Sequence, residues 1–259
     1  MDASVLELSF EMGRALLENG AEISRVQETM ERVATALHAE EFNVYVLSNA
    51  IFANGRENGV EKRMELAFVR NTTIHFGRIC AVNQLSREIV SGRCGLEEAC
   101  KRLTEIREIP RSRFPAMLFS CAVGSAAFSY LFGGCWPDAL AAFFCGLALE
   151  PFLYLADRHK LSKFLTNLCA SALVTAVAVL LTAVIPVGRD LDKVIIGSII
   201  RLVPGVALTT SIRDFFHGDY LSGTIRMIDA ILVGGCIAVG VGVVLRLLLP
   251  ILGMGGALL

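Results

Sequence analysis

The sequence predicts an α-helical polytopic membrane protein of about five transmembrane helices, preceded by an N-terminal α+β domain. The charge distribution is the first observation: residues 1–113 hold 32 of the 49 charged side chains, and the following 146 residues hold the other 17. Apolar residues make up 54% of the chain, which is above the usual share of a soluble domain. Several apolar stretches after residue 113 are long enough to approach or cross a bilayer core of about 30 Å. The net charge of −1 says nothing about nucleic acid, but the sequence has no basic patch on the scale that nucleic-acid binding needs, so no nucleic-acid partner is expected.

Residues 1–113 are expected to form a compact ααββαα domain. Apolar residues recur at helical spacing before residue 40 and again within 79–106, which predicts two helices on each side of a β-region. The period changes to two in Phe42–Val46 and Met64–Phe68, and the run 54–59 between these two strands is turn-forming. We find no nucleophile–base pair, phosphate loop or metal motif here. The sequence therefore predicts no enzyme, no metal and no cofactor, and the eight scattered cysteines are expected to be free thiols.

The membrane half is expected to cross the bilayer five times. The predicted spans are 114–136, 138–155, 164–186, 194–212 and 228–250. Lys and Arg are concentrated in alternate connections, which predicts a cytoplasmic N-terminal domain and a C-terminus outside. The acidic N-terminus lacks the basic and apolar regions of a signal peptide, so export of the first segment is not expected. Glycines gathered in the first and last spans are expected to allow close helix packing.

Arg201 is the most informative residue of the membrane half. It is the one charged residue within 194–212, and a charge at mid-membrane depth costs roughly 2.5–3.5 kcal/mol on insertion scales. Pro204 and Gly205 disfavour a continuous helix, and a broken helix leaves backbone groups that can hold a solute or ion. A guanidinium binds a carboxylate bidentately. We therefore expect a substrate site formed by Arg201, Pro204, Gly205 and the hydroxyl of Thr209.

Three further charged residues of the membrane half have more than one interpretation. Glu150, which precedes Pro151 in the second span, is the candidate proton-coupling group. It is also the candidate partner of Arg201 in a structural ion pair, and the two roles are compatible. Asp214 and Arg226 lie in a polar stretch that is expected to form a loop after the fourth span. They are either an ion pair at the cytoplasmic interface or part of a gate.

Two stretches of the chain resemble a known family. The first, at Leu202–Arg226, is LVPGVALTTSIRDFFHGDYLSGTIR, which combines a PG break, an RD pair, a G-D pair and S-G-x-x-R. The second, at Leu16–Leu37, is LLENGAEISRVQETMERVATAL. They resemble the signature and the cytoplasmic domain of the bacterial threonine/serine exporter (ThrE-type) family, and with the order of spans the resemblance covers nearly the whole chain. The motif positions, which we take as a gating loop with the PG break, are Pro204, Gly205, Arg213, Asp214, Gly218, Asp219, Ser222, Gly223 and Arg226.

The resemblance also implies a partner and a substrate class. Full-length members carry a second, smaller membrane domain, which this chain lacks, so it resembles the larger subunit of the split, YjjP-like branch. That branch implies a separate small membrane subunit of the YjjB type and an oligomeric assembly in the bacterial inner membrane. The fused branch is associated with threonine and serine, and the split branch with dicarboxylates such as succinate. The leading hypothesis is a proton-coupled exporter of a small carboxylate-bearing metabolite; the alternative is a non-transporting scaffold or sensor subunit.

Overall fold

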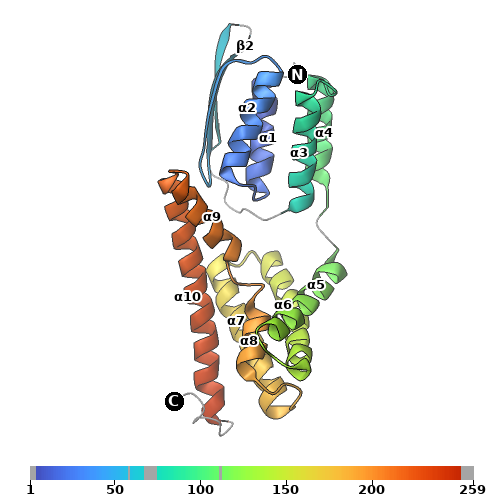
Figure 1. The fold of residues 1–259 in the computed structure, drawn as a ribbon, viewed down its shortest axis with the longest axis vertical. Helices are drawn as coiled ribbons and strands as arrows, with labels where there is room; N and C mark the ends of the chain where they lie inside the picture. Colours follow the sequence, from blue (N-terminus) through green and yellow to red (C-terminus); the bar gives the residue numbers. More distant parts are fainter. Residues whose placement is uncertain (1–3, 58, 67–74, 111–112, 252–259) are drawn as a thin grey trace. The chain divides into compact units, whose positions relative to one another are not determined.

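The chain divides into two compact units, each of which has its own hydrophobic core. The first unit runs to Arg111 and takes in the short segment 219–222, and the second unit holds the remainder. Figure 1 shows the elements of both units in chain order. The computed structural model describes residues 4–57, 59–66, 75–110 and 113–251.

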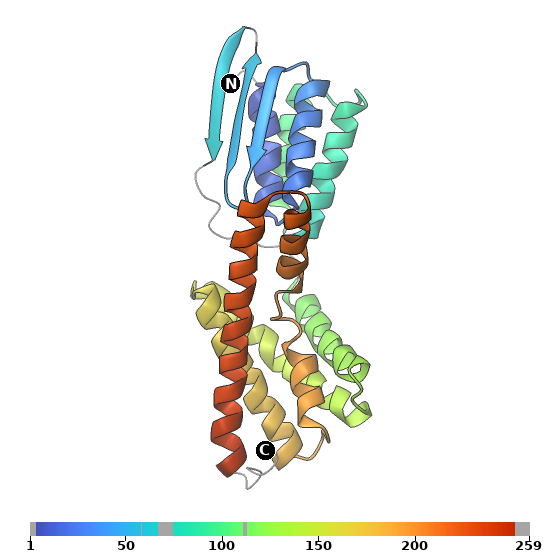
Figure 2. The ribbon, with the colours of Figure 1, turned by 60° about the vertical axis from the view of Figure 1, so that its left-hand side comes forward.

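The first unit consists of helices packed against a three-stranded antiparallel sheet. Its elements are α1 (Val5–Glu18), α2 (Ile23–Ala36), β1 (Glu40–Val46), β2 (Ile51–Glu57), β3 (Val60–Leu66), α3 (Phe76–Val90) and α4 (Leu96–Glu108). The strand order is β1-β2-β3, and the helices lie on one side of the sheet (Figure 2). Val26, Met30 and Val33, which the helical spacing placed on one face of α2, are fully buried in the core. The sequence period thus identified the buried face of this helix.

The sheet has one strand more than the predicted ααββαα order. Strand β2 includes most of the run 54–59, which the sequence analysis took as a turn. Its burial alternates, with Ile51, Ala53 and Gly55 facing the core. A side chain on Gly55 would place its Cβ 2.7 Å from Leu6 Cδ2, so this glycine allows α1 to approach the strand. Among the described residues of this run, only Gly59, at a φ of +78°, has the backbone of a turn residue. Phe68, the last residue of the other predicted strand, lies outside the described residues.

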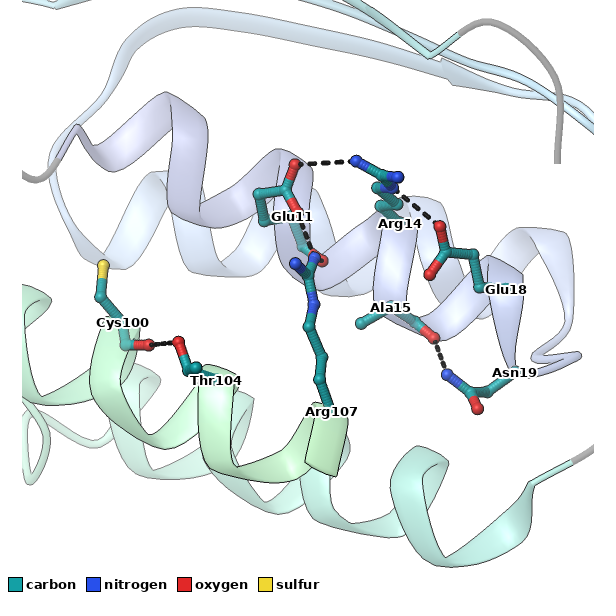
Figure 3. Close-up of polar contacts among 8 residues, drawn as sticks. All are labelled: Glu11, Arg14, Ala15, Glu18, Asn19, Cys100, Thr104 and Arg107. Atoms are coloured by element: carbon teal, nitrogen blue, oxygen red, sulfur yellow. Dashed lines mark hydrogen bonds and ion pairs between the residues drawn. The ribbon is translucent and has the colours of Figure 1, made fainter. Parts of the chain in front are cut away.

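Ion pairs connect the helices of the first unit across long sequence separations. Figure 3 shows Arg107 of α4 directed at Glu11 of α1, where it contacts the carboxylate and the backbone carbonyl. On α1 itself, Arg14 Nε donates to Glu18 Oε1 at 2.8 Å. Arg102 of α4 forms a second interhelical pair with Glu88 of α3. Two of these pairs thus connect helices, α1 with α4 and α3 with α4.

The Glu88–Arg102 pair predicts a loss of stability in acid. The guanidinium of Arg102 and the amide of Gln84 both donate to the Glu88 carboxylate, which lowers its pKa below the ordinary 4.5. Its contribution to stability is therefore complete above that ordinary value and is lost as the pH falls through the lowered pKa of the folded state. We expect the unfolding temperature of the purified chain to fall less steeply in acid for Glu88→Gln than for the unchanged protein. Glu105→Gln, at an exposed position of α4, is the control, and equal acid profiles for both variants would contradict the prediction.

The second unit is a bundle of helices. Its elements are α5 (Phe114–Leu131), α6 (Trp136–Arg158), α7 (Lys163–Val179) with the π-helical turn η1 (Leu180–Val184), α8 (Leu191–Ile199), α9 (Gly205–Phe216) and α10 (Tyr220–Ile251). Among the described residues, four helices are long and apolar enough to cross a membrane. They are Phe114–Leu131, Trp136–Arg158, Lys163–Val184 and Tyr220–Leu248. The unit therefore has the composition of a polytopic membrane domain.

The fourth predicted span, 194–212, is not a continuous helix. It consists of α8 and α9, of 9 and 12 residues, which are about 14 and 18 Å long at 1.5 Å per residue. Neither crosses a bilayer alone, and the prediction of about five spans is not confirmed. The break at Pro204 is present as predicted, because proline has no amide to continue the helical hydrogen bonds. The carbonyl of Ile200, which a residue at 204 would normally satisfy, instead accepts from Val203 at 3.3 Å.

Three glycines allow the helices of the second unit to pack at close range. A Cβ on Gly146 of α6 would lie 2.7 Å from Ala122 Cα of α5, and one on Gly197 of α8 would lie 2.5 Å from Ser129 N, also of α5. On α10, a Cβ on Gly240 would lie 2.5 Å from a backbone carbonyl of α7. Such small-residue contacts are the usual means by which membrane helices approach each other. The predicted packing role of the glycines in the first and last spans thus holds for Gly240, and the structure adds Gly146 and Gly197. The prediction was wrong for the other glycines of these spans, because a Cβ there would have no neighbour within 4 Å: Gly124, Gly234, Gly235 and Gly242.

Alanine substitution at Gly146, Gly197 or Gly240 is expected to destabilise the bundle. In Gly197→Ala the new methyl group meets backbone atoms of α5, which cannot move aside without shifting the helix. Overpacking of this kind costs roughly 1–3 kcal/mol. Gly124→Ala is the matched control, because a Cβ at that helical position has no neighbour within 4 Å. Thermal unfolding in detergent should show a lower midpoint for Gly197→Ala alone, and equal midpoints for the two variants would refute the packing role.

Candidate functional site

The centre of the candidate site is an acid–base pair within the second unit. Glu150 lies on α6 immediately before Pro151, and Arg201 lies in the turn between α8 and α9. Arg201 Nε stands 3.7 Å from Glu150 Oε2, so the two form an ion pair that is too long for a hydrogen bond. The Glu150 side chain is only 3% exposed, whereas that of Arg201 is 51% exposed. The sequence analysis named both residues, and the structure brings them together.

A cavity of about 330 Å³ adjoins this pair. We call it the Arg201 pocket, and it is lined by Ala116, Met117, Ser120, Cys121, Glu150 and Arg201. Its volume is at the small end of the range of about 300–1,000 Å³ that is typical of ligand sites. The lining is mainly apolar with a few polar groups, as in most small-molecule pockets. The pocket therefore has the size and chemistry for a small polar solute.

Glu150 has unused hydrogen-bonding capacity that faces this pocket. Its Oε2 atom is buried and has no hydrogen-bond partner among the described residues. A buried carboxylate oxygen without a donor is costly, and in a membrane bundle it marks a functional candidate. The half-exposed guanidinium of Arg201 likewise keeps donors available. The pocket thus offers a solute one hydrogen-bond acceptor of negative charge and several donors of positive charge.

The far end of α6 is held in place by a second buried carboxylate, that of Asp138. This side chain is fully buried and accepts hydrogen bonds from the backbone amides of Arg189 and Asp190 at 2.6 and 2.9 Å. It also accepts from the Cys135 amide at 2.8 Å and from the Cys135 thiol at 2.9 Å. Asp138 thereby ties the start of α6 to the segment that leads into α8. The two elements that carry Glu150 and Arg201 are fixed to each other through this contact.

The other predicted substrate residues do not line the Arg201 pocket. Pro204 is the residue before α9 and accepts a bond from Leu208, and Gly205 opens the helix with no neighbour at its Cβ position. The hydroxyl of Thr209 is exposed and donates to the Gly205 carbonyl at 3.0 Å within α9. These residues shape the helix break. Their predicted part in substrate binding stays a prediction.

The predicted gating loop is mostly helical. Arg213 and Asp214 lie in α9, while Ser222, Gly223 and Arg226 lie in the first turns of α10. The loop prediction was wrong here because α10 begins at Tyr220, eight residues before the predicted span. The turn between the helices includes Gly218, at a φ of +86°, and Asp219.

An ion pair joins α9 and α10 in this motif. Arg226 Nε stands 3.7 Å from Asp214 Oδ2, and both side chains are largely buried. A Cβ on Gly223 would lie 2.8 Å from the Phe215 ring and 3.1 Å from the Ser211 carbonyl, so this glycine allows the two helices to pack closely. The motif therefore forms a tight helical hairpin that encloses the Asp214–Arg226 ion pair.

Sequence reasoning missed the α5 wall of the pocket. Ala116, Met117, Ser120 and Cys121 are common membrane-helix residues without a charge or a motif. One signal that was present is that Ser120 and Cys121 are adjacent polar side chains in a mainly apolar span. Their position opposite Glu150 follows from the close contact between α5 and Gly146, which only the three-dimensional packing reveals.

A bundle in which four of the described helices are long and apolar enough to cross a membrane defines a polytopic membrane protein. The chain belongs to the threonine/serine exporter (ThrE) family, whose model, described as "Putative threonine/serine exporter", matches residues 7–248.

Curated relatives fall into two kinds by length. The "Threonine/serine exporter" of Corynebacterium glutamicum is 26% identical over 95% of this chain and 51% of its own length. The "Probable threonine/serine exporter" of Mycobacterium tuberculosis is 24% identical over 93% of this chain and 46% of its own length. This chain thus spans about half of these relatives. The "Probable succinate transporter subunit YjjP" of Escherichia coli is 27% identical over 94% of both chains. No solved structure matches this chain.

Proposed function

We propose that this chain is the larger subunit of a secondary exporter in the bacterial inner membrane, and that it moves a small carboxylate-bearing metabolite out of the cell. The main observation behind this proposal is the Arg201 pocket. There the half-exposed guanidinium of Arg201 lies beside a buried carboxylate oxygen of Glu150 that has no hydrogen-bond partner. Arg201 binds the carboxylate of the solute. Membership of the threonine/serine exporter family supports the transport role.

The charges of the pocket favour an amino acid over a dicarboxylate. An amino acid carries one carboxylate and one ammonium group, which match Arg201 and the Oε2 of Glu150, an atom that is ion-paired with Arg201 but has no hydrogen-bond partner, respectively. A dicarboxylate would bring a second negative charge toward Glu150, and like charges at close range are unfavourable unless one of them is protonated. Threonine and serine are therefore the first candidate substrates. Succinate, which the name of the Escherichia coli relative mentions, is the second.

Glu150 is also the proposed site of proton coupling. It lies about 18 Å along α6 from Asp138 at 1.5 Å per residue, and thus inside a span of 23 residues, about two-thirds of the way along it. A carboxylate at this depth that can bind either a proton or the solute's ammonium group links the two movements. The Asp214–Arg226 pair between α9 and α10 is a proposed gate, because its separation would release the helical hairpin.

A small membrane subunit of the YjjB type is the proposed partner. The relatives named as YjjP are described as subunits, and they match this chain over almost their whole length. The unit with the α+β fold is placed in the cytoplasm and the C-terminus outside, in agreement with the excess of Lys and Arg in alternate connections. A chain with its N-terminus inside and its C-terminus outside crosses the membrane an odd number of times. The four long helices give an even number among the described residues, so α8 and α9 together must act as one further, broken span.

Efflux from preloaded cells tests the proposal. Labelled threonine, serine and succinate are compared in cells that express this chain alone or with the small subunit, with both proteins quantified in the membrane. We expect threonine or serine to leave fastest, and only when both subunits are present. Faster efflux of succinate than of either amino acid would overturn the substrate assignment. A lack of efflux for all three would favour a scaffold or sensor subunit instead.

A further inference from the structure

The Arg201 pocket is lined by one hydroxyl group, that of Ser120 on α5. Ser120 is exposed, and its hydroxyl forms no hydrogen bond with any of the described residues. A serine in a helix can instead donate to the carbonyl four residues before it, as Ser198 of the same bundle does to Val194 at 2.7 Å. The hydroxyl of Ser120 is therefore available to a molecule in the pocket.

The α5 wall of the pocket combines this hydroxyl with an apolar surface. Ala116 and Met117 lie one turn before Ser120 and Cys121, and all four line the pocket. Residues three and four positions apart lie on the same face of a helix. A surface that can contact a methyl group thus lies beside a group that can bind a hydroxyl. The thiol of Cys121 is only a weak donor and acceptor, so Ser120 offers the stronger hydrogen bond.

The polar groups of the pocket come from three different elements. Glu150 lies on α6, Arg201 lies in the turn between α8 and α9, and Ser120 lies on α5. In the proposed function, Arg201 and Glu150 bind the carboxylate and the ammonium group of one amino acid. Both groups are attached to the same carbon atom of the solute. Its side chain is therefore left to face the remaining wall, which is formed by α5.

We propose that Ser120 binds the β-hydroxyl of threonine or serine, and that Ala116 and Met117 contact the methyl group of threonine. A serine hydroxyl both donates and accepts, so it can pair with a hydroxyl of the solute in either direction. The pocket thereby selects amino acids with a β-hydroxyl over aliphatic amino acids of the same size. The inference rests on the proposed function, in which Arg201 and Glu150 hold the other two groups of the amino acid.

Binding of amino acids that differ by one hydroxyl tests the role of Ser120 without transport. The full-length chain is co-expressed with the small membrane subunit and purified in lipid nanodiscs. Calorimetric titration then compares L-threonine with L-2-aminobutyrate, and L-serine with L-alanine. We expect the hydroxyl-bearing member of each pair to bind roughly 2- to 12-fold more tightly, as for one net hydrogen bond. In Ser120→Ala this preference should disappear, while unchanged binding of 2-aminobutyrate and alanine shows that the variant is folded.

Ser129→Ala is the matched control, because this serine lies on the same helix but does not line the pocket. Its preference for the hydroxyl-bearing amino acids should equal that of the unchanged protein. Equal affinities within each pair for the unchanged protein would overturn the inference. A preference that survives in Ser120→Ala would also overturn it, as would the loss of all binding in that variant, since the hydroxyl would then serve the fold.

Arg201→Gln distinguishes failure of this inference from failure of the proposed function. If Arg201→Gln weakens the binding of all four amino acids, the proposed substrate site stands, whatever Ser120→Ala shows. If Arg201→Gln leaves all four affinities unchanged, or if no amino acid binds to the unchanged protein, the proposed substrate site fails and the role of Ser120 fails with it.

Discussion

Replacing Arg201 with Gln is expected to abolish efflux while leaving the protein in the membrane. Gln has no charge and cannot form the paired, charge-assisted hydrogen bonds that a guanidinium makes with a carboxylate. A hydrogen bond to a charged group contributes roughly 1.5–3 kcal/mol, which corresponds to about a 10- to 150-fold loss of affinity. Efflux of labelled solute, normalised to the amount of protein in the membrane, measures the effect.

Two companion variants separate binding from structural pairing. Arg246→Gln removes another exposed arginine of the same unit that does not line the pocket, and it should leave efflux unchanged. In Arg201→Gln the buried Glu150 also loses its counter-charge, which is itself destabilising. The double variant Arg201→Gln/Glu150→Gln removes that problem. If it regains both stability and efflux, Arg201 serves the structure only; if it regains stability alone, Arg201 binds the solute.

Glu150→Gln is expected to remove the pH dependence of transport. The two side chains have nearly the same shape, but the amide cannot gain or lose a proton, which the proposed coupling role of Glu150 requires. Gln also lacks the negative charge that attracts an ammonium group, so the apparent affinity for threonine should fall with it. Initial efflux rates at a series of external pH values should vary for the unchanged protein and be flat for the variant.

Asp157→Asn provides the control for this experiment. Asp157 is an exposed carboxylate near the end of the same helix, and its replacement should preserve the pH profile. If the pH dependence of efflux persists in Glu150→Gln, the coupling group lies elsewhere in the protein. Loss of the profile in both variants would instead indicate a general effect of charge on α6.

Much of the architecture was predictable because the charge and hydropathy of a segment indicate whether water or lipid surrounds it. The uneven charge distribution separated the two units, and Pro204 marked the helix break. The pairing of Arg201 with Glu150 was also foreseen, since a buried charge needs a partner. Strand β2 was missed because Gly55 is a turn-forming residue in sequence, whereas in the fold it makes room for Leu6. The early start of α10 was missed because its first turns are polar.

The rest of the site depends on contacts that have no local signal. Nothing in the neighbourhood of Cys121 indicates that its helix will lie against Gly146, and the pocket exists only because it does. Asp138 resembles an ordinary residue at the start of a span. Its carboxylate nevertheless accepts from amides 51 and 52 residues further along the chain. Long-range contacts of this kind decide how the elements meet, and only the structure shows them.

The shortness of α8 determines how Arg201 is oriented. A helix that spans the bilayer is anchored at both interfaces, whereas the tilt of a nine-residue helix is set by the neighbours it packs on. For α8 those neighbours include α5, reached through Gly197, and the preceding segment held by Asp138. The lipid environment therefore has little control over the direction in which the guanidinium points. Substitutions at Gly197 and Asp138, which lie outside the pocket, should therefore change solute recognition among relatives whose pocket residues are identical.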